Sequence, residues 1–331
     1  MKKGRDRGLP PDDPRLAAPA LAGIVSDALS LLSEYASADG LRPMSNRVSD
    51  PLPSLLDECR ALCGPGAASR APVRLLLHQA CTGGSLIAKC LAAMPGTTLL
   101  SEMDPLSENH LQISQVAMYA PTDLIKQLRY SRHPADPELY VEIFLAGLAV
   151  LQDRLDRQGR RLVIRCHPHS QFFTAIDPAS RPGVTEMIAR QHPVRAALTV
   201  RHPLDSWLSL NNNQWVQFTP PTLEEYARRY LAFLDAVATQ EGGNPPPIRY
   251  EDFVADPEGV LQDLCALLDL PFVPGTPDLI AVIRVSGDSG RSDAVIGPRP
   301  RRAVPQDMLD AIAASPAYHD LCDRLGYDAA P

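Results

Sequence analysis

From residue 73 onward, short apolar runs alternate with longer segments in which apolar residues recur every three or four positions. The apolar runs are rich in strand-forming residue types and cover residues 73–77, 162–166, 196–200 and 247–250. Strands that alternate with helices predict an α/β fold with a mainly parallel sheet flanked by helices. Ligands of such sheets bind at the carboxyl ends of the strands, so the polar residues that follow each run are the first candidates for chemistry.

Capping residues mark the starts of the predicted helices. A helix is expected from about residue 85, after the first run. Asp-Pro pairs at residues 136–137 and 256–257 each begin a helix, and the first of these runs to about residue 158. The Thr-x-x-Glu pattern at residues 222–225 is a capping box that opens a further helix.

Residues 1–70 follow a different pattern. Residues 1–15 form a charged, proline-containing tail that we expect to be disordered. Amphipathic spacing predicts one helix over about residues 20–35 and a shorter one over about residues 52–63, before a Gly-Pro-Gly breaker. The sequence therefore predicts an N-terminal tail and helical extension in residues 1–70, and an α/β domain in residues 71–331.

Composition narrows the classes of function. The 331 residues carry 32 Lys and Arg against 39 Asp and Glu, and this net charge of −7 argues against a general nucleic-acid binder. Only four of the 32 cationic residues are lysines, so phosphate-type anions would be bound by guanidinium or backbone groups. No apolar run approaches the ~18 residues of a membrane span. The seven cysteines are odd in number and include no C-x-x-C, which is typical of reduced thiols in a cytoplasmic protein.

The first candidate site is the loop from His78 to Ser85, between the first strand and its helix. Its paired glycines let the backbone direct several N–H groups to one place, and the following helix adds its own N–H groups and positive dipole end. Such a nest suits an anion, most often a phosphate. It is not a Walker A loop, because the chain contains no Gly-Lys dipeptide. Taken alone, the loop also fits a tight turn that binds nothing.

A second candidate follows the third apolar run. Arg201 emerges at the end of that strand, and Asp205 can cap a helix that presents Ser209 one turn later. An arginine fork together with a hydroxyl on a helix suits a second phosphate clamp. The alternative is that Arg201 only forms an ion pair with Asp205.

A third candidate follows the second apolar run. His167 there suits a general base, and Arg165 beside it can stabilise developing negative charge. A metal site would need Cys166, His167 and His169 with a fourth ligand. No other Cys/His pair at ligand spacing supports such a site, so no metal is predicted. A surface histidine without a role also fits.

A late run from Ser286 to Arg291 places glycines beside an arginine, and Arg299, Arg301 and Arg302 follow it. Such a stretch suits a lid that closes on an anion, and it fits a basic solvated loop equally well.

Taken in order, these elements resemble the PAPS-dependent sulfotransferase family, in particular its bacterial members, from about Arg74 to Arg302. The segment from Cys81 to Ser85 falls at the place of that family's 5′-phosphate loop, which is commonly basic-Ser-Gly-Thr-Thr. Arg201, with Ser209 eight residues later, matches the family's 3′-phosphate element in residue type and spacing.

Four further segments are similar to family sequence: Met94-Pro95-Gly96 with Leu100-Ser101-Glu102, Arg165-x-His167, Ile248-Arg249-Tyr250-Glu251-Asp252-Phe253 with Asp256-Pro257, and Gly290-Arg291. The resemblance implies a P-loop NTPase-like sulfotransferase architecture, with PAPS as donor and PAP as product. It implies nucleotide binding by Cys81, Thr82, Gly83, Gly84, Ser85, Leu86, Arg201, Ser209, Tyr250 and Arg291. It also implies sulfuryl transfer to a hydroxyl or amine of an unidentified small-molecule or carbohydrate acceptor, with His167 as base and Arg165 steadying the negative oxygens.

Two positions depart from the family's pattern. The basic residue expected at Cys81 is missing, and Arg165, His78 or the loop amides can replace it. The aromatic residue that often follows the loop and stacks on adenine is Leu86 here, and Trp207 can serve instead or belong to the core.

Two alternatives stay open, and the acceptor pocket is only outlined. A P-loop kinase that uses ATP would need a loop lysine, which is absent, and Mg²⁺ ligands, for which only Glu102 or Asp104 is at hand. A non-catalytic PAP- or PAPS-binding relative would keep the phosphate clamps without a working base. The amide-rich segment 211–215 and the helix from Thr222 are expected to border the acceptor.

Overall fold

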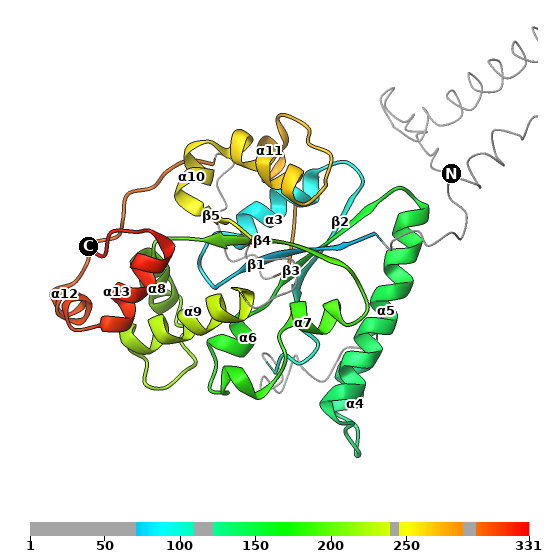
Figure 1. Cartoon of the computed structure of the whole chain (residues 1–331), viewed down its shortest axis with the longest axis horizontal. Helices are drawn as coiled ribbons and strands as arrows, with labels where there is room; N and C mark the ends of the chain where they lie inside the picture. The colour runs from blue at the N-terminus through cyan, green and yellow to red at the C-terminus, as the bar shows by residue number, and fades with distance from the viewer. Residues whose placement is uncertain (1–70, 109–121, 239–244, 287–295, 331) are drawn as a thin grey trace, which may run out of the picture. The chain divides into compact units, whose positions relative to one another are not determined.

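A parallel β-sheet forms the centre of the described part of the chain, which comprises residues 71–108, 122–238, 245–286 and 296–330 of the computed structural model. Its five strands lie in the order β2-β3-β1-β4-β5, and all four neighbouring pairs run parallel (Figure 1). The strands are β1 (Val73–His78), β2 (Thr97–Met103), β3 (Arg161–Cys166), β4 (Val194–Val200) and β5 (Pro247–Arg249). The predicted α/β fold with a mainly parallel sheet flanked by helices is confirmed.

The strand order reverses at β1. The chain passes from β1 through α3 (Gly84–Ala93) to β2 and returns by β3 on the same side, whereas β4 and β5 lie on the other side of β1. Ligands of open α/β sheets bind in the crevice at such a switch point. The loops that follow β1, β3 and β4 therefore meet at one edge of the sheet.

Helices cover both faces of the sheet (Figure 1). On one face, α3, α10 (Tyr250–Ala255) and α11 (Pro257–Leu267) pack against Leu76 and Val163. The opposite face presents Leu75 and Ile164 to a larger apolar cluster. The helices of that cluster are α5 (Pro137–Arg157), α6 (His169–Phe172), α7 (Val184–Ala189), α8 (Pro203–Asn212), α9 (Leu223–Ala238), α12 (Gln306–Ala313) and α13 (Pro316–Leu325). A short helix, α4 (Leu124–Arg129), and two 3₁₀ turns (Pro178–Ser180 and Thr276–Leu279) complete the described elements.

The predicted helix caps are present. Asp136 Oδ1 accepts from the Leu139 N–H at 3.1 Å, and Asp256 Oδ1 accepts from the Gly259 N–H at 3.0 Å. Thr222 Oγ1 accepts from the Glu225 N–H at 3.3 Å, which is one half of the predicted capping box. The Glu225 carboxylate pairs with Arg229 one turn later, at 2.7 Å, instead of returning to the cap.

One strand, β2, was not predicted, and two local predictions need correction. The strand at β5 ends at Arg249, and Tyr250 opens α10. Helix α8 is capped by His202, whose Nδ1 accepts from the Leu204 N–H at 3.2 Å, and Asp205 lies inside its first turn.

Some predictions fall outside the described residues, among them the tail and both helices of residues 1–70. Of the cysteines that the structure describes, Cys81, Cys90, Cys166, Cys265 and Cys322 are free thiols. Among the described helices, none is both long and apolar enough to cross a membrane.

Candidate active site

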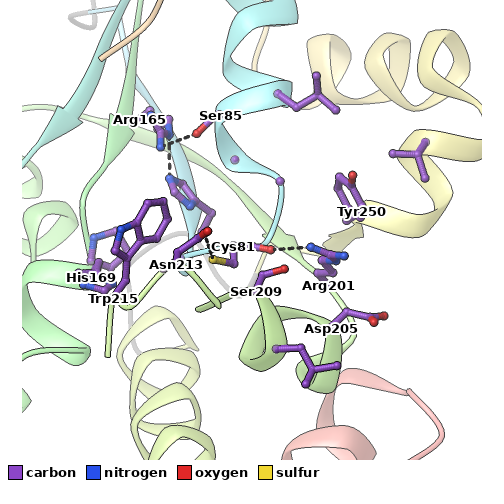
Figure 2. Close-up of a pocket in the computed structure, with 18 of the residues that line it drawn as sticks. Cys81, Ser85, Arg165, His169, Arg201, Asp205, Ser209, Asn213, Trp215 and Tyr250 are labelled. Carbon is purple, nitrogen blue, oxygen red and sulfur yellow. Dashed lines mark hydrogen bonds between the residues drawn. The ribbon is translucent and has the colours of Figure 1, made fainter. Parts of the chain in front are cut away.

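A cavity of about 1170 Å³ opens where the loops after β1, β3 and β4 meet (Figure 2). Ten of the twelve predicted site residues line it, namely Cys81, Gly83, Gly84, Ser85, Leu86, Arg165, His167, Arg201, Ser209 and Tyr250. Thr82 does not line the cavity, and Arg291 lies outside the described residues.

The loop after β1 is shaped by two residues with left-handed backbone angles, Cys81 at φ +65° and Gly83 at φ +88°. Between them Thr82 turns inward, fully buried, and its hydroxyl donates to the Gln79 carbonyl at 2.7 Å. The Thr82 side chain therefore stabilises the turn, and its predicted part in nucleotide binding stays a prediction. Helix α3 begins directly after Gly83, and its first N–H groups, which have no intrahelical acceptor, lie at the cavity.

Both loop glycines are required by close neighbours. A β-carbon on Gly83 would lie 2.3 Å from Cδ2 of Tyr250, and one on Gly84 would lie 2.4 Å from Cγ of His78. The rings of Tyr250 and His78 thus pack directly on the loop backbone and hold it against the ends of β5 and β1.

Cys81 supplies no positive charge at the position where a basic residue was expected. Burial raises the pKa of its thiol to about 11, although the charge of Arg201 opposes this shift. The thiol is therefore protonated at neutral pH. Asn213 Nδ2 lies 4.0 Å from the sulfur, so Cys81 connects the loop to the end of α8 (Figure 2).

Arg165 is the buried cation beside the loop. Its Nη2 donates to Ser85 Oγ at 2.9 Å and also contacts Glu102, and its Nε donates to His78 Nε2 at 3.0 Å. Its Nη1 donates to Ser101 Oγ at 2.6 Å and to the Ser286 carbonyl at 3.0 Å. All five N–H groups of the guanidinium are therefore directed at protein acceptors. Arg165 is held in one orientation and acts on its surroundings mainly through its charge.

His78 is a neutral partner of this arginine. Its Nδ1 lies 2.9 Å from the Gln79 carbonyl, and its Nε2 accepts from Arg165, which assigns the proton to Nδ1. Burial and the nearby charge of Arg165 lower the pKa of His78 to about 4. Of the groups proposed to replace the missing basic residue, His78 is thus excluded at neutral pH, whereas Arg165 and the loop amides are in position.

Glu102 lines the cavity, and its contact with the proposed base was not predicted from the sequence, which placed it only in a family-like segment and among possible Mg²⁺ ligands. Its carboxylate contacts both Arg165 Nη2 and His167 Nδ1. Burial opposes its ionisation, but the hydrogen bond and charge of His167, with the charge of Arg165, lower its pKa below the ordinary value. The available signal was its place next to Leu100-Ser101 in a family-like segment, but the strand that carries it was not predicted.

Arg201 stands at the opposite end of the loop. Its guanidinium carbon lies 4.8 Å from the centre of the Tyr250 ring, and its Nη1 donates to the Cys81 carbonyl at 3.2 Å. Asp205 pairs instead with Arg301, at 3.1 Å, so the alternative in which Arg201 only neutralises Asp205 is wrong. Ser209 lines the cavity from α8, on the same side as Arg201.

The late basic segment also reaches the cavity. Arg299, Arg301 and Arg302 line it, and Ser286 exchanges two hydrogen bonds with Ser101, at 2.9 and 2.8 Å. The chain on each side of residues 287–295 is therefore tied to the site. The closing motion expected of a lid stays a prediction.

Aromatic and amide side chains line part of the other side of the cavity. Figure 2 shows Tyr250, Arg201 and Asp205 on one side of the loop, and His169 and Trp215 on the other. Asn213, Trp215 and Gln217 line the second side, as expected for an amide-rich border beside an aromatic residue.

A hydrogen-bonded turn at the end of α8 forms this border. Gln214 adopts φ +57°, and the Trp215 N–H donates back to the Leu210 carbonyl at 3.1 Å, as in a Schellman motif. The turn directs Trp215 back toward the cavity.

Trp207 does not line the cavity. It is 2% exposed and packs in the core against Tyr226, with ring centres 5.2 Å apart. Its suggested role in stacking on adenine is therefore wrong, and it belongs to the core. Leu86, 7% exposed, lines the cavity at the position where that aromatic residue was expected.

The carboxylates considered for a magnesium site are already engaged by cations. Asp104 accepts from both terminal nitrogens of Arg181, at 3.2 and 2.7 Å, and Glu102 is held by Arg165 and His167. Within the described ranges, no group of three or more His, Cys, Asp or Glu side chains is arranged to hold a metal ion.

Residues 80–274 match the model of the sulfotransferase family. Because this match covers more than half of the chain, the chain belongs to that family, and sulfuryl transfer is the activity its membership supports. No curated protein matches the sequence.

Several solved structures resemble the described fold. The sulfotransferase domain from the curacin biosynthetic pathway is 17% identical and aligns over 78% of this chain and 99% of its own, with a TM-score of 0.48. The sulfotransferase domain from the Synechococcus PCC 7002 olefin synthase is 16% identical over 81% of this chain and 98% of its own, with a TM-score of 0.49. A sulfotransferase from Alicyclobacillus acidocaldarius is 16% identical over 78% of this chain and 96% of its own, with a TM-score of 0.41.

Proposed function

We propose that the chain transfers a sulfuryl group from PAPS to a hydroxyl, or an amine, of a small-molecule or carbohydrate acceptor. One observation carries the proposal. An anion loop at the switch point of the sheet, an Arg201–Ser209 pair and a histidine held by a carboxylate surround a single cavity. Each of these features follows a different strand, so the fold brings three separately encoded features to one place.

The donor would lie along the Arg201 side of the loop. The loop amides and the start of α3 suit the 5′-phosphate, because they supply N–H groups and a positive dipole end. Arg201 and Ser209 suit the 3′-phosphate, and the Tyr250 ring, which packs on Gly83, suits the adenine side. Arg165 donates to Ser85 at the start of α3, next to this part of the cavity. Its positive charge would stabilise the negative charge on the oxygens of the transferred sulfuryl group.

When bound, PAPS supplies an activated sulfuryl group on its 5′-phosphate. His167 would take the proton of the acceptor hydroxyl as the acceptor oxygen approaches sulfur in line, through a loose transition state like that of phosphoryl transfer. The loop amides and the start of α3 would stabilise the charge that develops on the leaving phosphate. These donors are held by the backbone and need little rearrangement during the reaction.

The acceptor would occupy the other side of the cavity. Trp215 offers an aromatic face, and Asn213 and Gln217 offer amide donors and acceptors close to it. Such a wall suits a hydroxylated ring, whose apolar face packs on the indole while its hydroxyl groups meet the amides.

A thermal-shift titration with PAP, AMP, ADP and ATP plus Mg²⁺ tests the donor assignment without any acceptor. PAP at 100 times its Kd stabilises the fold by about 2.7 kcal/mol, which is readily measured. We expect PAP to raise Tm most. A larger shift with ATP and Mg²⁺ would support a kinase instead, and no shift with any nucleotide would contradict the proposal.

A second experiment separates an enzyme from a non-catalytic binding protein. The protein is incubated with PAPS and a panel of phenolic, carbohydrate and amine acceptors, and PAP release is measured. We expect acceptor-dependent PAP release. Tight PAP binding without such release over the whole panel would favour the non-catalytic relative.

A further inference from the structure

We propose that Glu102 is a positioning residue of this site, which orients His167 and sets the nitrogen at which it accepts a proton. The inference rests on the proposed function, because it assigns a role within the same reaction. It is carried by three independent features: an irregular strand, a bridging carboxylate and the charge distribution around the imidazole.

The backbone at Glu102 departs from regular strand geometry. Parallel pairing with β3 joins Ser101 to Arg165 and Met103 to Cys166, so Glu102 is the extra residue of a bulge. Its φ of +59° lies in the left-handed region, which is unfavourable for a residue other than glycine. Bulges redirect side chains beside active sites, and a strained glutamate at such a position calls for a functional reason.

The redirected carboxylate connects two strands of the site. One oxygen contacts Arg165 Nη2 and the other contacts His167 Nδ1, and the Glu102 side chain is 20% exposed. Arg165 in turn donates to Ser85 at the start of α3. The base, the buried cation and the anion loop are thus linked through one glutamate.

The contact determines how His167 can act. A proton on Nδ1 that donates to Glu102 leaves the ring lone pair on Nε2, so Nε2 is the basic nitrogen. In the transfer step the acceptor O–H bond breaks and its proton goes to Nε2, while the acceptor oxygen forms a bond to sulfur. The bond from sulfur to the phosphate oxygen breaks, and its electron pair stays on the phosphate. Glu102 then faces an imidazolium, which its negative charge stabilises.

The charges around His167 allow the role of Glu102 to be measured. Glu102 contacts it from β2, Arg165 of β3 contacts the same carboxylate, and His78 of β1 and His169 of α6 lie near enough to feel its charge. Burial lowers the pKa of His78 and of His169 to about 4 in each case, with nearby positive charge adding to the shift. Above about pH 5 both are neutral, and Glu102 and Arg165 are the charged groups among these four neighbours. Removing the negative charge of Glu102 should therefore move the acid limb of the kcat/KM profile to lower pH.

The test compares Glu102→Gln, Glu102→Asp and His167→Ala with the full-length wild type. In Glu102→Gln we expect kcat to fall by about 10- to 100-fold, less than the 10²- to 10⁴-fold that loss of the base itself costs. The acid limb of the kcat/KM profile should move to lower pH, because a neutral amide no longer favours the imidazolium. KM for PAPS and the PAP thermal shift should change by less than a few-fold. Glu102→Asp keeps the charge and should retain the position of the limb.

Glu142→Gln, an exposed change on α5, is the matched control and should match wild type in every measurement. An unchanged kcat and pH profile in Glu102→Gln would overturn the proposal. A loss as large as in His167→Ala at every pH would show that Glu102 itself removes the proton. Loss of PAP binding would show that the residue only supports the nucleotide site.

A readout without turnover separates this proposal from the proposed function. ¹⁵N NMR of histidine-labelled protein reports which ring nitrogen of His167 carries the proton. We expect Nδ1–H in wild type and a mixture of tautomers in Glu102→Gln. If wild type shows no sulfuryl transfer but this difference is seen, the proposed function fails and the positioning role stands. If His167 has the same tautomer in the wild type and in Glu102→Gln, the positioning role is wrong whatever the activity.

Discussion

The ring of Tyr250 packs against the backbone of Gly83, so close that a single β-carbon on Gly83 would fall 2.3 Å from the ring atom Cδ2. The glycine also has φ +88°, which side chains rarely adopt. Two separate constraints, backbone angle and space, therefore apply to Gly83, the N-cap residue just before α3. The contact joins the loop after β1 to the segment after β5, more than 160 residues later in the chain.

Gly83→Ala should therefore harm both stability and nucleotide binding. The left-handed angle alone costs about 1–2 kcal/mol, and the displaced Tyr250 ring adds to it. Urea unfolding should show a loss of at least that size, and the PAP thermal shift should shrink. Gly147→Ala is the control, because Gly147 lies in α5 with nothing near its missing β-carbon, and it should be stabilised by up to about 1 kcal/mol. Normal stability and PAP binding in Gly83→Ala would show that the loop adapts.

His167→Ala should abolish turnover while PAP affinity stays within a few-fold. A general base contributes about 10²- to 10⁴-fold in rate, whereas the proposed nucleotide contacts are the loop and Arg201 on the other side of the cavity. Initial rates of PAP release together with isothermal titration of PAP check this outcome. Equal losses of rate and PAP affinity would show that His167 is structural.

Arg201→Ala should weaken PAP but hardly change AMP, which lacks the 3′-phosphate. An arginine contact to a phosphate contributes about 1.5–3 kcal/mol, so PAP affinity should fall by at least tenfold. Isothermal titration with both nucleotides gives the comparison. If both lose affinity alike, Arg201 acts by holding Tyr250 and the Cys81 carbonyl, and its role as a 3′-phosphate clamp is wrong.

His78 should make the protein less stable in weak acid. Its pKa is lowered from 6.5 to about 4 in the folded state, so below pH 6.5 the unfolded chain binds a proton that the folded chain does not. Stability is therefore full above about pH 6.5 and is lost as the pH falls toward 4, by about 3 kcal/mol in all. His78→Gln retains an acceptor for Arg165 and does not titrate. Urea unfolding at pH 7, 6 and 5 should show a shallower pH dependence for this variant, and an unchanged slope would contradict the assignment.

Trp215→Ala should raise KM for the acceptor and leave PAP binding intact. The indole lines the cavity on the side away from Arg201, so its loss removes a packing surface for the acceptor alone. Kinetics with varied acceptor at saturating PAPS should show at least a tenfold rise in KM, consistent with about 1.5 kcal/mol or more of lost contact. A change in PAP affinity instead would place Trp215 at the donor.

The buried strands were predictable because their two covered faces produce continuous apolar runs. Strand β2 differs: it lies at the sheet edge, its sequence is TTLLSEM, and all of it except Thr97 is only partly buried. Mixed burial leaves neither a continuous run nor a regular alternation. The contact of Glu102 with His167 was not predicted either, since a bulge cannot be recognised before the strand that contains it.

Most of the candidate site could be predicted because its residues follow strands directly. The partners of Arg201 could not be predicted. Its nearest acidic neighbour in sequence, Asp205, pairs instead with Arg301, which lies 96 residues after Asp205 in the chain. The inward direction of the Thr82 hydroxyl could not be predicted either. The residue types of a phosphate loop do not reveal which side chains point outward, and the hydroxyl of Thr82 completes the turn from inside.

Helix α8 begins two residues after Arg201, carries Ser209 and closes in the turn that presents Trp215. Residues on both sides of the cavity thus belong to one helix and its C-terminal turn, which gives the proposed donor and acceptor sites a shared support. Thermodynamic reciprocity then applies: any factor by which PAP changes the affinity for the acceptor is the factor by which the acceptor changes the affinity for PAP. One titration of PAP, with and without acceptor, therefore measures the communication in both directions.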